Sequence, residues 1–446
     1  MCETLYAGFS RQKVTPDYSA PLAGHGNMMG RMSEEVIDDL FVTCVAITSG
    51  EETILIYSMD IIGIDAEMLE RFRGAVREAT GIAGTKVFFS ATHTHSAPTP
   101  YRNLALVSSL QGELATRFQE ELCAASVAAA QEALADRIPA QLLCTTQRIP
   151  GMNYVRHYVM GNGSYHGSQF GSSESGFVGH AGPTDPRMIL VQLKREEKPS
   201  ILLMNWQAHN DNAKGVGWRN ISSSYVGKIR ENFEKDTGML FCYICGASGN
   251  QNPNSLIPAE RHSLDWIAYG KKLADYAIAA LPKLEAVEGT AIKTTHTELE
   301  VGANHAWDSM VPQAQEVVDF WYSTGKGAAA TELAKTFGFT SCNHCSAILH
   351  LATLPETMIL ELNAFTIGDL AFVTSTNEAF SDMGLYVRAY APYDTVVFIA
   401  GNRGYLPSAI AYDYRAYEAD TTMYAKGSCE KASYEIVRML KELKGN

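Results

Sequence analysis

The sequence predicts a mixed α/β fold, a large single domain over residues 1–446 in which mixed β-sheets are flanked by helices. Runs rich in β-branched and aromatic residues alternate with segments of helical periodicity along the chain. No Pro- or Gly-rich linker and no internal repeat divides it. Polar side chains recur where predicted strands end, from Asp60 to Tyr405, which favours one domain whose site draws on most of the chain.

The composition argues against several classes of protein. A net charge of −13 and a pI near 5.4 disfavour nucleic acid as a partner. No apolar run approaches the ~18 residues of a membrane span, and the first residues lack the apolar segment of a signal peptide. We therefore expect no stable membrane association. The nine cysteines are scattered and odd in number, which favours reduced thiols and a cytoplasmic location.

The first hundred residues are predicted to form strands 6–14, 39–49, 52–60 and 87–89 and a helix over 66–80. That helix ends at Gly81, because glycine adopts the left-handed conformation that closes a helix. A Gly-rich segment, 23–26, lies between the first two strands and contains His25. We expect His25 and Asp60 to have structural roles.

The strongest chemical signal is the sequence KVFFSATHTHSAPTPY, residues 86–101. A short strand leads into His93-Thr94-His95, and the prolines that follow stop regular structure. Side chains two positions apart in an extended segment point the same way, so His93 and His95 should face one direction. Two imidazoles held so close are typical of a metal-ligand pair, or of a ligand beside an acid–base group. A surface turn with hydrogen-bonded histidines is the alternative.

A binding loop is predicted in the middle of the chain. Helix 113–135 and strand 140–148 precede residues 150–186, in which Gly and Ser dominate and aromatics and three histidines are interleaved. A long segment of this kind inside a compact protein is usually a lid or a binding loop. Its polar start contains Asn153 and Arg156, two candidates for the site.

Two more strands end in polar groups. Strands 188–193 and 200–206 should pair, and the second leads into His209, while the buried strand 239–245 leads into the polar segment 246–254. Helices are predicted at 223–235, capped by the serines at 222–224, and at 264–280, capped by Ser263.

The last third of the chain adds the remaining candidates. Glu378 follows strand 370–374 and precedes a helix that ends near residue 390, and Tyr405 follows strand 396–400. By itself, a carboxylate at a helix start more often accepts backbone hydrogen bonds, and a tyrosine more often packs. The other predicted elements are strands 291–301, 347–354 and 357–367, a helix over 311–337 that breaks near 324–327, and a helix over 424–443.

Two Cys-x-x-Cys pairs do not predict a zinc site. Cys242 and Cys245 lie in an apolar run typical of a buried strand, where a thiol acts as a small hydrophobic group. Cys342 and Cys345 lie in a more polar stretch of sequence and flank His344. The two pairs are much farther apart than the pairs of a zinc ribbon, so we do not expect them to share a metal.

Landmarks in the same order resemble the neutral and alkaline ceramidases, zinc amidases that cleave N-acyl sphingosines. FSATHTHSAP is similar to the family's SSTHTHSGP, NWQAH to its NWFAVH, and GNQNPN to its GDVSPN. The resemblance covers most of the chain as ordered landmarks. The later ones are Asn377-Glu378, similar to the family's PGE, Gly404-Tyr405, similar to its GY, and Tyr417-Glu418, similar to its RYE.

The resemblance implies a site and a reaction. Two histidines and a carboxylate are ordinary zinc ligands, and bound Zn²⁺ lowers the pKa of its water to ~7. An imidazole can pass a proton to the departing amine. The implied zinc ligands are His93, His209, Glu378 and Tyr405. The implied catalytic residues are His95 near the substrate carbonyl and leaving nitrogen, Tyr417 donating to the oxyanion, and Arg156 from the substrate loop.

Two departures from the family pattern shape the expected function. Asn252 stands at the position of the family's serine and Asn250 at that of the preceding acid, which closes a route through the serine and leaves one through metal-activated water. Asn252 and Asn153 are candidates for substrate binding. The chain ends soon after Tyr417, without the family's C-terminal β-sandwich domain, so we expect a smaller or more soluble amide than membrane-borne ceramide.

The sequence thus predicts a zinc-dependent amidohydrolase that cleaves the amide bond of an N-acylated small molecule. An ester, lactone or other C–N hydrolase with the same metal site is the first alternative. A non-catalytic binding homologue is the second, because two asparagines replace family residues. Nitrogen and oxygen ligands also suit Mn²⁺ or Fe²⁺.

Overall fold

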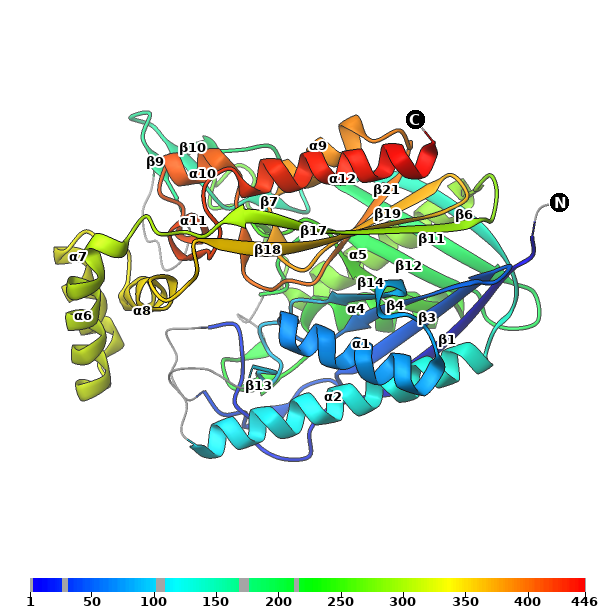
Figure 1. Cartoon of the computed structure of the whole chain (residues 1–446), viewed down its shortest axis with the longest axis horizontal. Helices are drawn as coiled ribbons and strands as arrows, with labels where there is room; N and C mark the ends of the chain where they lie inside the picture. The colour runs from blue at the N-terminus through cyan, green and yellow to red at the C-terminus, as the bar shows by residue number, and fades with distance from the viewer. Residues whose placement is uncertain (1–2, 26–30, 102–108, 168–175, 212–215, 446) are drawn as a thin grey trace.

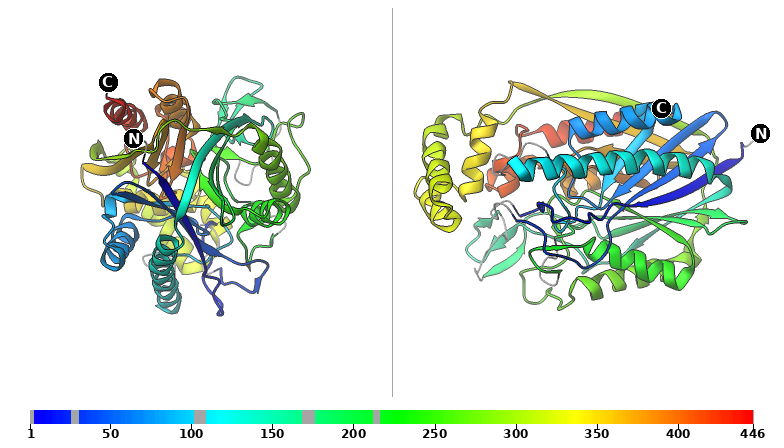
Figure 2. Two further views of the ribbon diagram at one scale, coloured as in Figure 1. Left: turned by 90° about the vertical axis from the view of Figure 1, so that its right-hand side faces the viewer. Right: turned by 90° about the horizontal axis from the view of Figure 1, so that it is seen from below.

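The computed structural model describes residues 3–25, 31–101, 109–167, 176–211 and 216–445. The protein is layered, with two β-sheets inside and helices on the outer faces (Figures 1 and 2). The predicted fold class, mixed α/β with mixed sheets flanked by helices, is confirmed.

The larger sheet has nine strands. They are β1 (Leu5–Lys13), β3 (Phe41–Ser49), β4 (Glu52–Met59), β5 (Val87–Ala91), β6 (Ile138–Arg148), β11 (Arg187–Arg195), β12 (Ile201–Trp206), β14 (Leu240–Cys245) and β16 (Glu285–Ala286). Their order is β14-β12-β11-β6-β1-β3-β4-β5, and β16 pairs with β6. Only β4–β5 and β12–β14 pair in parallel among these described strands. The two ends of the sheet approach each other, since the Cys245 N–H donates to Ser90 Oγ at 3.0 Å.

A second sheet packs face to face on the first. It is formed by β17 (Ile292–Gly302), β18 (Thr357–Ile367), β19 (Leu370–Ser375) and β21 (Val396–Ala400), in that order, with β19 and β21 parallel. The Phe88 ring of β5 stacks on Phe365 of β18 at 4.3 Å between centroids. The Asn205 side-chain amide of β12 donates to the Phe398 carbonyl of β21 at 2.8 Å. An apolar core and a buried polar bond therefore hold the two sheets in register.

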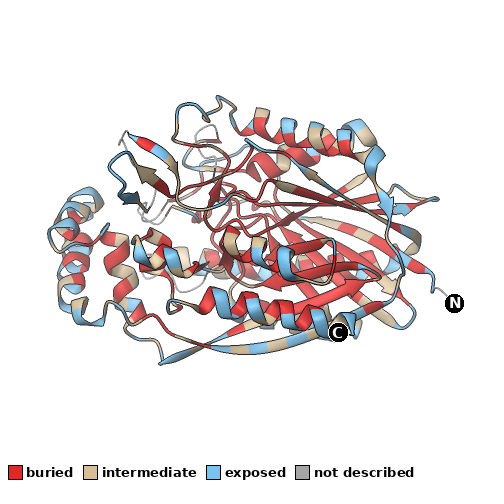
Figure 3. Ribbon diagram, turned by 90° about the horizontal axis from the view of Figure 1, so that it is seen from above, coloured by how far each residue is buried: buried red, intermediate tan, exposed pale blue. Residues whose placement is uncertain are grey.

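Helices cover the outer faces of both sheets, each with one side buried and the other exposed (Figure 3). In α1, Met68, Leu69, Phe72 and Val76 are buried at the spacing of one helical face. The covering helices are α1 (Ala66–Thr80), α2 (Ser109–Ala135), α4 (Ser224–Thr237) and α5 (Trp266–Ala280) on the larger sheet, and α9 (Ser381–Tyr390) and α12 (Ser428–Lys444) on the smaller. None of the helices in the described segments has both the length and the apolar character that crossing a bilayer requires.

Three helices between β17 and β18 leave the layers and form a separate small core around Trp321 (Figure 1). They are α6 (Val311–Thr324), α7 (Gly327–Thr336) and α8 (Cys342–Leu351). The predicted break near 324–327 is confirmed, because Gly325 ends α6 with a φ of +66°.

Two predictions about these elements are wrong. The strand predicted at 347–354 is largely part of α8, since Cys342, Cys345 and Ile348 are buried three residues apart, a helical spacing. The predicted cap Ser263 does not begin α5. Asp265 does, and its carboxylate accepts from the Ala268 N–H at 2.8 Å.

The parallel strand pairs place several loops at one end of the layers. Strands β4, β5, β12, β19 and β21 each end just before a candidate residue, as parallel sheets place binding residues at the carboxyl ends of their strands. The remaining elements are short: β2 (Glu35–Val36), β7 (Tyr154–Val155), β8 (Tyr158–Met160), β9 (Tyr165–His166), β10 (Phe177–His180), β13 (Asn220–Ile221), β15 (Gln251–Asn252), β20 (Glu378–Ala379), β22 (Tyr405–Leu406), α10 (Ala409–Asp413), α11 (Tyr417–Thr421) and the single-turn helices Gly84–Lys86, Leu281–Lys283 and Asp308–Met310.

Candidate metal centre

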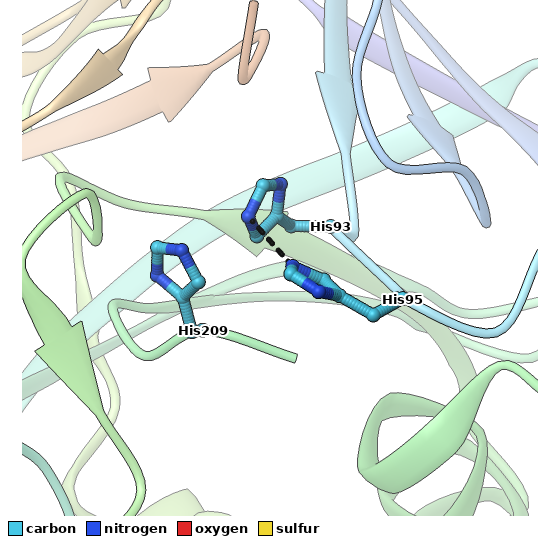
Figure 4. A group of neighbouring side chains, drawn as sticks. All are labelled: His93, His95 and His209. Carbon is cyan, nitrogen blue, oxygen red and sulfur yellow. Dashed lines mark hydrogen bonds between the residues drawn. The ribbon is translucent and has the colours of Figure 1, made fainter. Parts of the chain in front are cut away.

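His93 and His95 lie side by side after β5, with 3.3 Å between their Nε2 atoms (Figure 4). The prediction that they meet is correct, but the reason given for it is wrong. The strand ends at Ala91, and His93 has a φ of +61°, so this segment is not extended. A non-glycine residue in the left-handed region is uncommon and is often found at functional sites.

His209, after β12, completes a group of three buried histidines. Each of His93, His95 and His209 offers one nitrogen, and these atoms lie within 4.8 Å of one another. The loops that carry them are joined directly. Thr94 forms a parallel bridge with Asn210, and the His95 N–H donates to the Asn210 carbonyl at 3.2 Å.

Backbone carbonyls orient two of the three imidazoles. His93 Nδ1 lies 2.6 Å from the Ile62 carbonyl, and His209 Nδ1 lies 2.9 Å from the Ser248 carbonyl. Because a carbonyl only accepts, Nδ1 carries the proton and Nε2 keeps its lone pair. Histidines that bind metals are usually held in this way. The buried His209 Nε2 has no hydrogen-bond partner.

The Glu378 carboxylate faces the same two nitrogens. Its Oε2 lies 3.4 Å from His93 Nε2 and 3.5 Å from His209 Nε2, and it accepts no hydrogen bond. Ligand atoms ~2.0–2.1 Å from a tetrahedral zinc ion are about 3.4 Å apart. The Glu378 oxygen therefore lies at the spacing of a ligand set from both nitrogens. Burial raises the pKa of Glu378 to about 8 and lowers that of His93 to about 4.

Helix capping does not explain Glu378. The residue lies in β20, whereas α9 begins at Ser381. The Asn250 carboxamide provides the cap, since its Oδ1 accepts from the Ser381 N–H at 2.8 Å. The carboxylate is thus left to face the histidines.

Tyr405 lies next to Glu378, because β20 and β22 pair in parallel with these two residues opposite each other. The Tyr405 ring stacks on His209 at 6.5 Å between centroids, and its hydroxyl accepts from Arg156 Nη2 at 3.1 Å. The structure therefore brings Arg156 from the predicted binding loop to the edge of the histidine group. The ring of Tyr417 lies 6.2 Å from that of Tyr405.

Two further residues beside this group, Glu418 and His157, are not among the predicted site residues. Glu418 accepts from Arg156 Nε at 2.6 Å and from His157 Nε2 at 2.9 Å, and all three side chains are fully buried. Glu418 belongs to one of the family-like landmarks, and His157 follows Arg156 directly. Their positions in the sequence, within a family-like landmark and next to a candidate arginine, could have indicated both residues.

Solved structures share this architecture. The chain aligns with the crystal structure of neutral ceramidase from Pseudomonas aeruginosa with a TM-score of 0.72 and 15% sequence identity. The alignment covers 99% of this chain and 75% of the ceramidase chain. The chain has the neutral ceramidase fold. A second alignment, with a ceramidase complexed with C2, covers 99% of this chain and 76% of that chain, with a TM-score of 0.72 and 13% sequence identity. No protein-family model and no curated protein matches the sequence.

Within this ceramidase fold, the two asparagine candidates have different surroundings. Asn252 Oδ1 accepts from Arg156 Nη1 at 3.4 Å, so it lies beside the site. The Asn153 amide donates to the carbonyls of Asp185 and Gln207 at 2.8 and 2.9 Å. Asn153 thus bonds the start of the predicted binding loop to Gln207, which directly follows β12 and lies two residues before His209. Substrate binding by either residue remains a prediction.

The residues expected to be structural lie around the site. The Asp60 carboxylate forms a buried ion pair with Arg230 at 2.8 Å and accepts from the Phe41 N–H at 3.0 Å. His25 packs edge-on against His95 at 5.3 Å between ring centroids. The candidate metal-ligand group found among the described residues contains no cysteine, and the cysteines of the two Cys-x-x-Cys pairs lie in apolar clusters.

Proposed function

We propose that the protein is a zinc-dependent hydrolase that cleaves the amide bond of an N-acylated small molecule, with the metal held by His93, His209, Glu378 and Tyr405. The observation that carries the proposal is the convergence of two imidazole Nε2 atoms and one carboxylate oxygen at 3.4 and 3.5 Å. His209 Nε2 and Glu378 Oε2 are buried without hydrogen-bond partners, which fits a cation. The likeness of fold to two ceramidases supports an amide as the bond that is cleaved.

His95 is the proposed proton carrier. When bound, Zn²⁺ supplies a Lewis acid and lowers the pKa of water to ~7. His95 lies beside the ligand atoms, yet its Nδ1 has no hydrogen-bond partner, unlike the two anchored imidazoles. Burial holds the pKa of His95 well below 6.5, so the ring is neutral at pH 7. A neutral imidazole accepts a proton and delivers it to the departing amine nitrogen.

Tyr417 and Arg156 are proposed to act on the carbonyl side. Burial raises the pKa of Tyr417 to about 12, so its hydroxyl keeps the proton and can donate a hydrogen bond to the developing oxyanion. Such a donor contributes ~3 kcal/mol to transition-state stabilisation in other enzymes. Arg156 adds a fixed positive charge next to Tyr405, and Asn252 lies beside that guanidinium.

The test combines elemental analysis with activity on a panel of N-acyl amides, esters and lactones. We expect about one zinc ion per chain, and amide hydrolysis that a chelator abolishes and Zn²⁺ restores. His93→Ala should lose both metal and activity. His296→Ala, which changes an exposed histidine of β17, is the matched control and should keep both.

The other outcomes separate the alternatives. Hydrolysis of esters or lactones without hydrolysis of amides would show that the protein is an ester or lactone hydrolase with the same metal site. Bound metal without any hydrolysis would favour a binding protein. Unchanged metal content and activity in His93→Ala would overturn the proposed centre.

A further inference from the structure

A buried chain of hydrogen bonds leads from Tyr405 away from the histidines. Arg156 Nη2 donates to Tyr405 Oη at 3.1 Å, and Arg156 Nε donates to Glu418 Oε1 at 2.6 Å. His157 Nε2 lies 2.9 Å from Glu418 Oε2, and His157 Nδ1 lies 2.9 Å from Tyr414 Oη. A carboxylate only accepts, so His157 donates from Nε2 to Glu418. Arg156 and His157 therefore both donate to the same buried carboxylate.

Stability alone does not account for this arrangement. Arg156, His157 and Glu418 are fully buried, and a buried ion pair is often no more stabilising than apolar side chains of the same size, because both charges lose their hydration. The ion pair instead fixes the orientation of the Arg156 guanidinium. Arg156 Nε and Nη2 both lie 2.6 Å from Glu418 Oε1, which prevents the guanidinium from rotating.

The chain also joins two parts of the protein that are distant in sequence. Arg156 and His157 belong to the predicted binding loop, whereas Tyr405, Tyr414 and Glu418 lie in the C-terminal segment. The buried carboxylate is bonded to both residues of the loop, so it sets where Arg156 meets the Tyr405 hydroxyl.

We propose that Glu418 and His157 are positioning residues that hold Arg156 against the Tyr405 hydroxyl and so aim the Tyr405 oxygen at the metal. The inference rests on the proposed function, because it takes Tyr405 as a metal ligand. Partners that orient a metal ligand typically change metal affinity or activity by 10–100-fold when they are mutated.

Glu418→Gln tests the proposal because it removes the charge and keeps the shape. Metal-free wild type and variant are titrated with Zn²⁺ against a chromophoric chelator, and their Co²⁺-loaded forms are compared by visible absorption. We expect an affinity ~10–100-fold lower in the variant and an altered cobalt spectrum. His157→Gln keeps the Arg156–Glu418 pair and should change both readouts in the same direction by less.

Asp136→Asn is the matched control, because it removes the carboxylate paired with another buried arginine, Arg195, outside the site. It should lower thermal stability without changing zinc affinity or the cobalt spectrum. Glu418→Gln with wild-type affinity and spectrum would overturn the positioning role while the proposed function stands. A wild type that binds no metal would overturn the proposed function itself. Should Glu418→Gln not fold, His157→Gln decides: wild-type values for both readouts would overturn the role.

Discussion

Replacing Glu378 by glutamine should stabilise the protein without metal at alkaline pH and destabilise it with metal. The Glu378 side chain is 9% exposed and faces two imidazole nitrogens. Burial is the largest influence on its pKa and raises it to about 8, although Arg156 partly offsets the rise. A glutamine side chain has a similar shape and no charge to desolvate.

The magnitude follows from the shift in pKa. One unit corresponds to about 1.4 kcal/mol, so ionising Glu378 in the metal-free protein costs up to about 5 kcal/mol. Between about pH 4.5 and 8, the folded protein keeps a proton that the unfolded chain has released. The stability of metal-free wild type therefore falls as the pH rises through this window. The glutamine variant lacks this contribution.

Zinc should reverse the order of stability. Structural sites with four ligands bind Zn²⁺ with ~10–16 kcal/mol, so one ligand accounts for about 3 kcal/mol. The loss of the Glu378 ligand then weakens binding by ~100-fold. The cation also removes the cost of ionising the wild-type carboxyl group, because it neutralises the charge.

The assay is urea unfolding of both proteins at about pH 5 and about pH 9, with either a chelator or Zn²⁺ present. Without metal, Glu378→Gln should equal wild type near pH 5 and exceed it near pH 9. With Zn²⁺, wild type should be the more stable at both. Metal-free proteins that respond alike to pH, or equal stabilisation of both proteins by Zn²⁺, would contradict the role of Glu378 as a buried metal ligand.

Four further substitutions test other parts of the structure. His209→Ala should lose zinc, as elemental analysis would show, and a full complement of metal would contradict its role as a ligand. Tyr417→Phe should lower kcat by ~10²–10³ with little change in KM, as expected for an oxyanion donor, and steady-state kinetics with an unchanged kcat would exclude that role. Burial alone would raise the pKa of Glu418, but Arg156 overcomes this effect and the pKa is lowered to about 2. The stability that this group contributes is complete above about pH 4.5 and is lost as the pH falls toward 2. In Glu418→Gln the free energy of unfolding should therefore fall by up to ~3 kcal/mol less than in wild type over this range. An equal fall in both proteins would contradict this expectation. Phe365→Ala should cost ~3–5 kcal/mol in urea unfolding because its ring stacks between the two sheets, and a loss below ~1 kcal/mol would show that the sheets repack.

Periodicity located most of the secondary structure because long elements repeat their pattern many times. Helix 66–80 and strands 357–367 and 396–400 have the predicted bounds. The error at 347–354 arose where a short apolar run fits both periods, so the sequence alone favoured the wrong one. Whether this run lies in a sheet or in the small core around Trp321 depends on contacts with α6, which a local pattern does not contain.

Position at the end of a strand predicts which residues are chemically suitable for a site, but it does not predict their geometry. His93 and Glu378 are far apart in the chain, and their atoms meet because β5 and β19, the strands that they follow, belong to two sheets packed face to face. The left-handed turn at His93 aims its ring, and no neighbouring residue type signals that conformation. His157 gave no sign of a partner in sequence because its carboxylate lies in the C-terminal segment.

The kinds of element, their order, and the imidazole, carboxylate and phenol groups that follow the strands can be read from the amino-acid sequence. Those features depend on side-chain chemistry and on interactions between near neighbours. The three-dimensional packing sets which ring nitrogens carry protons and which atoms face one another, and it places a buried glutamate between the predicted binding loop and the C-terminal segment. These properties depend on distances of a few ångströms between remote segments, and such distances are set by the packing of the two sheets as a whole.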